Sequence, residues 1–252
     1  MGSVGRSEKG NCRSTNEDAI FIFDAPYGCL PNLYILADGM GGHKAGEVAS
    51  NSAIQFFCDY IHENRTIILK ENYEYLEVIK KAILYANHKI YNMAKTDDEL
   101  EGMGTTFVVA TIINNKLLVE NIGDSRLYII RDEEIIQITV DHTYIMELLK
   151  TGKLTEKEMI NHPNKNAITR ALGTEESLEI DTFEIELHQD DIIMMCSDGL
   201  TNMLNDNEAL DIILKSDDIE NTSKVLVDRS NEHGGTDNIS VILINGFNGE
   251  VK

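Results

Sequence analysis

Apolar residues recur with two different periods along the chain, and these periods predict its elements. Alternating or continuous apolar positions predict a pair of strands at residues 19–23 and 32–37. Apolar spacings of three and four predict two long amphipathic helices at residues 45–62 and 75–94. The alternating pattern then returns, and it predicts further strands at residues 105–113, 116–122, 126–131 and 134–139.

The second half of the chain repeats this order after an irregular stretch. Short helical or irregular pieces are expected at residues 141–152, 155–162 and 165–172. Strands are predicted at residues 177–187, 191–196 and 238–244, with helices at 207–215 and 220–233 between them. Because the helices come in pairs and do not alternate with strands, the pattern favours an α+β fold. We expect a four-layer α-β-β-α sandwich, in which two central antiparallel sheets are flanked by antiparallel helix pairs.

The charge of the chain narrows the classes of partner. The 252 residues carry a formal net charge of −21, which argues against binding to nucleic acid or to anionic lipid. No apolar run approaches the roughly 18 residues of a membrane span, and no secretory signal pattern is visible. The 4 cysteines are far apart and lack the spacing of a zinc site. A reduced, cytoplasmic location is therefore expected.

Carboxylates stand beside several of the predicted strands, each with a small or polar neighbour. They are Glu17, Asp18, Asp38, Asp124, Asp198 and Asp237. Carboxylates gathered at one edge of a sheet repel each other unless cations lie among them. Hard divalent ions prefer oxygen ligands, and Gly39 allows the backbone to approach an ion closely. The ligand types therefore indicate Mg²⁺ or Mn²⁺ and not a structural Zn²⁺.

Such a cluster of acids indicates phosphate chemistry. Two ions about 3.5–4 Å apart can activate a water and hold an oxyanion during in-line displacement, and phosphate esters are the usual substrates. A dianionic phosphate also needs a fixed cation. Arg13 lies just before the first acids, and a guanidinium can bind two phosphate oxygens at once.

The ordered motifs of the chain closely resemble the metal-dependent serine/threonine protein phosphatases, the PPM or type-2C family, in the compact bacterial form. The matching segments are GNCRSTNED, ILADGMGGHKAGEVAS, GMGTTFVVA, VENIGDSRLYII, TVDHTYIMELLKTGKLTEKEMINHPNKNAITRALG, IIMMCSDGLTNML and HGGTDNISVILI. They extend from about Lys9 to Ile244, so the resemblance covers essentially the whole chain. It implies a single catalytic domain over residues 1–252, with a small flap inserted at about residues 141–173.

The resemblance implies a metal-binding role for each of five residues. Asp38 should bridge two metal ions, and the carbonyl of Gly39 should bind one of them. Asp198 and Asp237 should complete the other site. Asp124 matches the acid that contributes to a third, weaker site in bacterial members. The implied cofactors are thus Mn²⁺ or Mg²⁺ in two tight sites, with a possible third.

The remaining site residues follow from the same resemblance. Glu17 matches the acid that holds a metal-bound water, with Asp18 as its neighbour, and Arg13 matches the arginine that binds phosphate. Some members have a histidine directly after the Asp-Gly pair as a candidate general acid. Met40 stands there in this chain and the nearest histidine is His43, so the acid for the leaving group stays unassigned.

The implied function is hydrolysis of phosphoserine and phosphothreonine on proteins. A metal-activated water attacks phosphorus at a binuclear Mg/Mn centre, and no phosphoenzyme forms. The enzyme should act in bacterial signal transduction, on phosphoproteins that a partner Ser/Thr kinase modifies, and as a monomer.

Four other functions are weighed against this one. A cysteine phosphatase needs a cysteine in a phosphate-binding loop, which none of the cysteines has. A passive calcium-binding protein needs a DxDxDG-type loop, which the sequence lacks. A catalytically silent binding module should have lost one or more ligands, yet every expected acid is present. A phosphatase of the same fold that acts on a small stress or sporulation regulator stays open.

Overall fold

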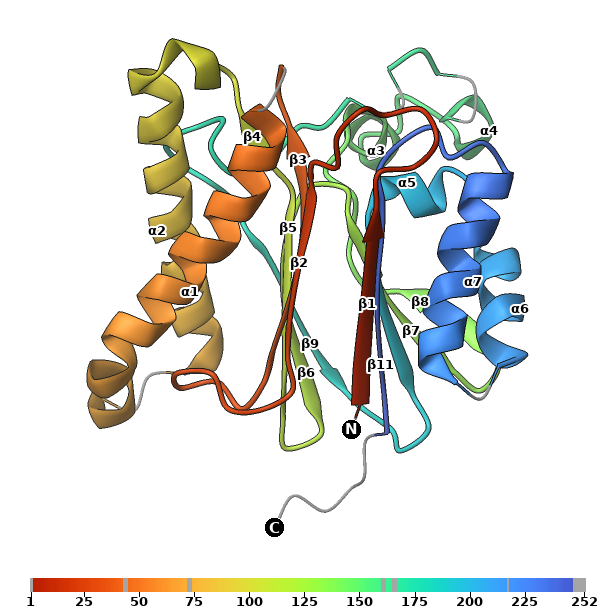
Figure 1. Ribbon diagram of the computed structural model, residues 1–252, viewed down its shortest axis with the longest axis horizontal. Helices are drawn as coiled ribbons and strands as arrows, with labels where there is room; N and C mark the ends of the chain where they lie inside the picture. The colour runs from red at the N-terminus through yellow and green to blue at the C-terminus, as the bar shows by residue number, and fades with distance from the viewer. Residues whose placement is uncertain are drawn as a thin grey trace.

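The computed structural model describes residues 2–42, 45–71, 74–159, 162–164, 167–216 and 218–246. Two antiparallel sheets lie face to face in the middle, and helices cover the two outer faces (Figure 1). This arrangement confirms the four-layer sandwich expected from the pairing of helices.

The first sheet has the strand order β1-β11-β10-β7-β8. Its strands are β1 (Gly2–Glu8), β7 (Arg126–Arg131), β8 (Glu134–Gln137), β10 (Ile192–Cys196) and β11 (Ile239–Asn245). The second sheet has the order β2-β3-β5-β6-β9, and a short strand β4 also pairs with β3. Its strands are β2 (Asp18–Phe23), β3 (Leu33–Met40), β4 (Gly104–Thr105), β5 (Phe107–Ile113), β6 (Lys116–Ile122) and β9 (Asp181–Glu186).

The helices fall into two pairs and several short pieces. The second sheet is covered by α1 (Ala45–Glu71) and α2 (Tyr75–Thr96), and the first by α6 (Asp206–Leu214) and α7 (Ile219–Glu232) (Figure 1). The short helices are η1 (Asp98–Leu100), α3 (Tyr144–Lys150), α4 (Glu156–Met159) and α5 (Asp198–Thr201). None of the helices in the described ranges combines the length and the hydrophobicity needed to cross a bilayer.

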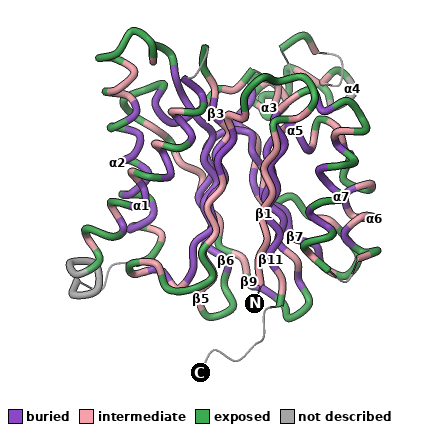
Figure 2. The backbone as a smooth tube through the Cα atoms, viewed as in Figure 1, coloured by how far each residue is buried: buried purple, intermediate pink, exposed green. Residues whose placement is uncertain are grey.

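The alternation of side chains along each strand produces three hydrophobic layers. On β3, Leu33, Ile35 and Ala37 pack under α1 and α2, whereas Tyr34 and Leu36 pack between the sheets. Both sets are buried, which explains why the central strands read as continuous apolar runs. Figure 2 shows these buried strands in the centre of the molecule and exposed positions on the outer faces of the helices. The two-residue turns 114–115 and 132–133 have the positive φ angles that are typical of tight hairpins.

Three expectations about elements need correction. No strand was predicted before residue 19, yet β1 pairs along its whole length with β11 at the edge of the first sheet. The single strand expected at residues 105–113 is divided at Thr106, because its hydroxyl and not its carbonyl accepts the hydrogen bond from the Asp38 amide. The strand expected at residues 177–187 begins only at Asp181, because Asp181 pairs with Asn121 and its partner strand β6 ends one residue later, at Ile122.

Candidate metal centre

A small cavity lies where the loops of both sheets meet at one end of the sandwich. Its volume is about 250 Å³. Its lining residues are Arg13, Glu17, Asp38, Gly39, Met40, Gly41, Asp124, Ile168, Asp198, Asp237 and Asn238. The structure therefore brings together, from segments more than 200 residues apart, all but one of the side chains that the sequence marked as candidates.

Each acid that lines the cavity lies at or near the terminus of a strand. Asp38 lies near the end of β3, directly opposite Asp18 on β2. Asp124 lies in the turn that joins β6 to β7, and Asp198 is the first residue of α5, just after β10. Asp237 lies just before β11. These positions confirm that the repeated pairing of an acid with a small neighbour marks strand ends, and that the marked ends converge.

The backbone at Asp38 is fixed by two threonines. The Asp38 amide donates to Thr106 Oγ1 at 2.9 Å, and the Asp38 carbonyl accepts from the Thr106 amide and from Thr105 Oγ1, both at 2.9 Å. The next residue must be glycine, because a Cβ on Gly39 would lie 2.0 Å from the carbonyl oxygen of Gly46. The carboxylate and the neighbouring carbonyl are thereby held in rigid backbone.

The loop before β2 is tied to the loop before β11. Asn238 accepts a hydrogen bond from the Glu17 amide at 2.8 Å and donates to the carbonyls of Lys9 and Thr15. Arg13 Nη2 donates to Asp237 Oδ2 at 2.8 Å. The Arg13 side chain is 53% exposed, so its guanidinium stands at the mouth of the cavity and not inside the core.

Burial and mutual repulsion raise the pKa values of the acids. Burial, followed by repulsion from Asp18 and Asp198, holds the pKa of Asp38 well above its ordinary value. Burial raises the pKa of Asp124 to about 7 and that of Asp18 to about 6. Burial and the charge of Asp237 also raise the pKa of Asp198. A cluster that resists ionisation in this way is stabilised by cations.

The donor set fits a hard divalent cation. Oδ1 of Asp18, Asp124 and Asp198 is in each case buried without a hydrogen-bond partner, and an unpaired buried oxygen is costly unless something positive binds it. In the ranges that the structure describes, no group of three or more acidic, histidine or cysteine side chains is arranged to hold a metal as it stands. The Asp237 carboxylate is turned to Arg13, and that of Asp198 accepts from Asn202 at 3.0 Å. These two carboxylates must turn towards an ion to bind it.

One candidate of the sequence, Asp18, lies apart from the others. Asp18 does not line the cavity; it is 7% exposed and accepts a hydrogen bond from Ser197 Oγ at 2.8 Å, behind Asp38. His43 lies outside the described residues. The sequence also gave no role to Ile168, which lines the cavity from the inserted segment between β8 and β9. Ser197 could have been marked, because it directly precedes Asp198 in the CSDG motif.

The raised pKa values predict how stability varies with pH in metal-free protein. An acid whose folded pKa is raised stabilises the fold below its ordinary pKa, and this contribution is lost as pH rises through the folded value. For Asp124 that interval runs from 3.8 to about 7. In chelator at pH 8, Asp124→Asn should therefore raise the free energy of unfolding by roughly 2 kcal/mol and the melting temperature by about 5 °C. At pH 5 the increase should be much smaller. Calorimetric melts at both pH values check this, and an equal effect at both would contradict it.

Comparisons with known proteins show similarity along most of the chain. Residues 3–239 match the family described as Protein phosphatase 2C. The chain is 37% identical over 239 residues to the serine/threonine phosphatase stp of Listeria welshimeri, which covers 95% of this chain and 93% of the relative. It is 36% identical to the protein phosphatase PhpP of Streptococcus pneumoniae, over 94% of each chain.

Solved structures are also similar to this chain over nearly its whole length. The serine/threonine phosphatase of S. agalactiae superposes with a TM-score of 0.87 at 33% identity, over 97% of this chain and 99% of that chain. The catalytic domain of the serine/threonine protein phosphatase PstP, in complex with 2 manganese ions, superposes with a TM-score of 0.78 at 31% identity over 96% of each chain.

Proposed function

The chain belongs to the protein phosphatase 2C family and is a metal-dependent serine/threonine protein phosphatase, and from this premise we propose which of its residues form the catalytic centre. Asp38, Asp198 and Asp237 hold the two main metal ions, together with the Gly39 carbonyl. Asp124 contributes to a third, weaker site. Glu17 holds water at the cavity, and Asp18 supports the cluster from behind.

One observation carries this proposal. The acids from five strand ends line one cavity of about 250 Å³, and the buried oxygens of two of them, Asp124 and Asp198, have no hydrogen-bond partner. Structural acids in a core are paired with a cation or with donors, as Asp191 is with Arg131 at 2.6 Å. Acids that converge without such partners favour a cation site over a structural role. They also argue against a silent binding module, which needs no such costly cluster.

The chemistry divides between the metal ions and the residues around them. Bound Mn²⁺ or Mg²⁺ supplies an activated nucleophile at neutral pH and neutralises charge on the phosphoryl group. The rigid backbone around Asp38 fixes the position of the acids, so little reorganisation accompanies the reaction. Arg13 binds the outer oxygens of the phosphate and orients it for in-line attack. Its pairing with Asp237 uses one of its nitrogens, and the rest of the guanidinium can face a substrate.

Replacing Arg13 tests the assignment of the phosphate site. Arg13→Ala should raise KM for a phosphothreonine peptide about tenfold with kcat nearly unchanged, because an interaction made equally in the ground and transition states affects KM alone. Arg13→Lys should fall in between, since it keeps the charge and loses the planar fork. Inhibition by free phosphate should weaken in parallel. Steady-state kinetics on one peptide measure all three effects.

The matched control is Arg65→Ala, an exposed arginine far along α1. It should leave KM and phosphate inhibition as they are. If Arg13→Ala also leaves both unchanged, Arg13 only pairs with Asp237 and the phosphate is bound elsewhere.

The partners follow from the activity. We propose that the chain acts as a monomer and as one catalytic domain, and that it removes phosphate placed on proteins by a partner Ser/Thr kinase. The segment 141–173 is proposed to act as a flap that controls substrate access, since Ile168 brings it to the cavity edge. A small stress or sporulation regulator as the substrate remains the second candidate, because it would use the same site.

A further inference from the structure

In the inserted segment between β8 and β9, residues 142–144 pair with residues 167–169 beside the cavity, and this paired region is called the neck. Thr143 and Ile168 form an isolated antiparallel bridge. On either side of it, the Tyr144 amide donates to the Ala167 carbonyl and the Thr169 amide donates to the His142 carbonyl, both at 2.8 Å. Because Ile168 lines the cavity, the position of this neck fixes one wall of the proposed catalytic centre.

His142, at the base of the neck, makes two hydrogen bonds to Gly123. The His142 amide donates to the Gly123 carbonyl at 3.0 Å, and the Gly123 amide donates to His142 Nδ1 at 3.0 Å. A ring nitrogen that accepts carries no proton, so the ring proton is assigned to Nε2. Nε2 lies 3.2 Å from Asp181 Oδ2, which can accept its proton, and 3.3 Å from Arg170 Nη1, which itself donates to Asp181 Oδ1. The ring is 3% exposed, and burial lowers the pKa of His142, which agrees with a neutral ring that accepts at Nδ1.

Gly123 directly precedes Asp124, and the turn that carries them leaves little freedom. Gly123 has φ +101°, and a Cβ there would lie 2.6 Å from Thr106 Cβ. Asp124 Oδ1 is buried and has no hydrogen-bond partner. The location of that oxygen therefore depends on the backbone of the turn, and the Gly123 amide is held through the His142 ring.

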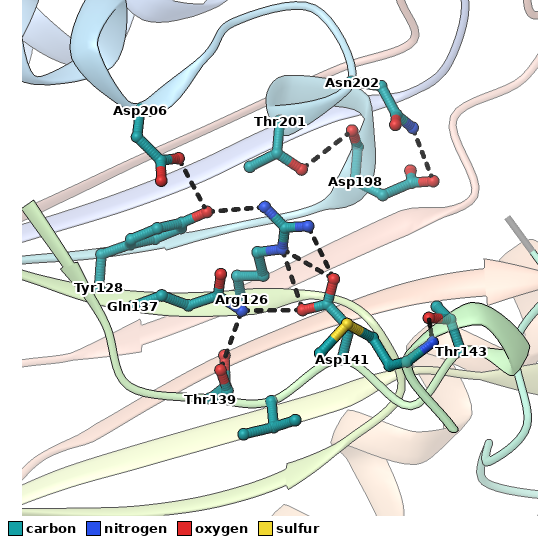
Figure 3. A network of polar contacts seen from close by, with 12 residues as sticks. Arg126, Tyr128, Gln137, Thr139, Asp141, Thr143, Asp198, Thr201, Asn202 and Asp206 are labelled. Carbon is teal, nitrogen blue, oxygen red and sulfur yellow. Dashed lines mark hydrogen bonds and ion pairs between the residues drawn. The ribbon is translucent and has the colours of Figure 1, made fainter. Parts of the chain in front are cut away.

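A second contact ties the other end of the turn to the same segment. Arg126 Nε lies 3.0 Å from both carboxylate oxygens of Asp141, and Nη2 donates to Oδ2 at 2.7 Å. Figure 3 shows the guanidinium facing this carboxylate, with Tyr128 on its other side. In the sequence, Asp124 thus lies between Gly123, which is bound to His142, and Arg126, which is bound to Asp141.

We propose that His142 is a positioning residue, which uses Nδ1 to hold the Gly123–Asp124 turn so that the Asp124 carboxylate is aimed into the metal centre. This inference rests on the proposed role of Asp124 as a ligand. It assigns no contact with substrate to His142. Replacing a residue that orients a metal ligand in this way typically lowers metal affinity by roughly 10–100-fold.

Two substitutions of His142 separate positioning from packing. In His142→Asn, the Oδ1 atom can take the place of Nδ1 and still accept from the Gly123 amide. In His142→Gln, the amide reaches towards Asp181 and leaves no acceptor at the Nδ1 position. If the proposal is right, Asn preserves the function and Gln does not, although Gln is the closer match in size.

Three measurements are made on the full chain. Hydrogen exchange of the Gly123 amide in chelator should be slow in wild type and His142→Asn, and at least about tenfold faster in His142→Gln. Calorimetric titration with Mn²⁺ should show the weakest site weakened about tenfold in His142→Gln alone. The Mn²⁺ concentration for half-maximal turnover of a phosphothreonine peptide should rise equally, with KM for the peptide unchanged. His188→Asn, an exposed histidine before β10, is the control.

The outcomes separate this inference from the function on which it rests. If Asn and Gln behave alike, or if Gly123 exchanges faster without any change in Mn²⁺ binding, the positioning role is wrong. If Asp124→Ala leaves Mn²⁺ binding as in wild type, Asp124 is not a ligand, and the inference fails together with that assignment. If His142→Gln does not fold, fast exchange of Gly123 in wild type or loss of Mn²⁺ binding in His142→Asn overturns the proposal.

Discussion

Asp38→Asn should lower kcat/KM for a phosphothreonine peptide by about a thousandfold, which corresponds to roughly 4 kcal/mol of transition-state stabilisation. Asp38 is partly buried, its backbone is held by Thr105 and Thr106, and the charges of Asp18, Asp198, Asp124 and Asp237 all act on its carboxylate. An amide of the same shape keeps the packing and removes the charge that attracts a cation. The loss should therefore appear in turnover and in Mn²⁺ titration together.

The fold of this variant should survive. Removing one charge from a group of acids that repel each other relieves repulsion, so the metal-free melting temperature should stay the same or rise. Asp190→Asn, at an exposed position in the turn before β10, is the control and should change neither property. A large fall in the metal-free melting temperature of Asp38→Asn would show that Asp38 is chiefly structural.

The layers of the fold could be predicted because each depends on local periodicity. On β3 the alternate residues enter two different cores, and both the strand and the helix after it were visible as patterns. The strand β1 could not be predicted in this way. Its sequence GSVGRSE has little apolar character, and it forms a strand because the edge of β11 offers unpaired backbone groups along its whole length. Edge pairing of this kind is decided by the partner strand.

The candidate site, like the fold, has a part that could be predicted from the sequence and a part that could not. The acids could be found because each stands beside a strand with a small neighbour, a signal contained in a few consecutive residues. The residues that hold these acids in position could not be found in this way. Thr106 holds the Asp38 amide from 68 residues away, and Ser197 reaches Asp18 across 179 residues. His142 contacts Gly123 only because the inserted segment folds back on the β6–β7 turn. Such contacts depend on tertiary packing, which a single sequence does not display.

Removal of divalent metal should abolish activity. In excess EDTA, turnover of a phosphothreonine peptide should fall at least about a thousandfold, and Mn²⁺ or Mg²⁺ in excess over EDTA should restore it. The reason is electrostatic as well as chemical. A dianionic phosphate that enters a cavity lined by carboxylates meets about 4 kcal/mol of repulsion per pair of unit charges 4 Å apart, at an effective dielectric constant near 20. Circular dichroism in EDTA should show that the fold is kept.

The pH dependence of this restoration tests the same acids independently. Burial raises the pKa of Asp124 to about 7 and that of Asp18 to about 6, so protons compete with metal for the cluster below neutral pH. If one proton must leave for each ion bound, the Mn²⁺ concentration for half-maximal activity rises about tenfold per pH unit below pH 7 and levels off above it. Asp124→Asn should flatten this dependence if its proton is the one displaced. Full turnover in EDTA at any pH would exclude a metal-dependent reaction at this cavity, whereas a pH-independent Mn²⁺ requirement would keep the metal and reject proton displacement from Asp124 as a step of its binding.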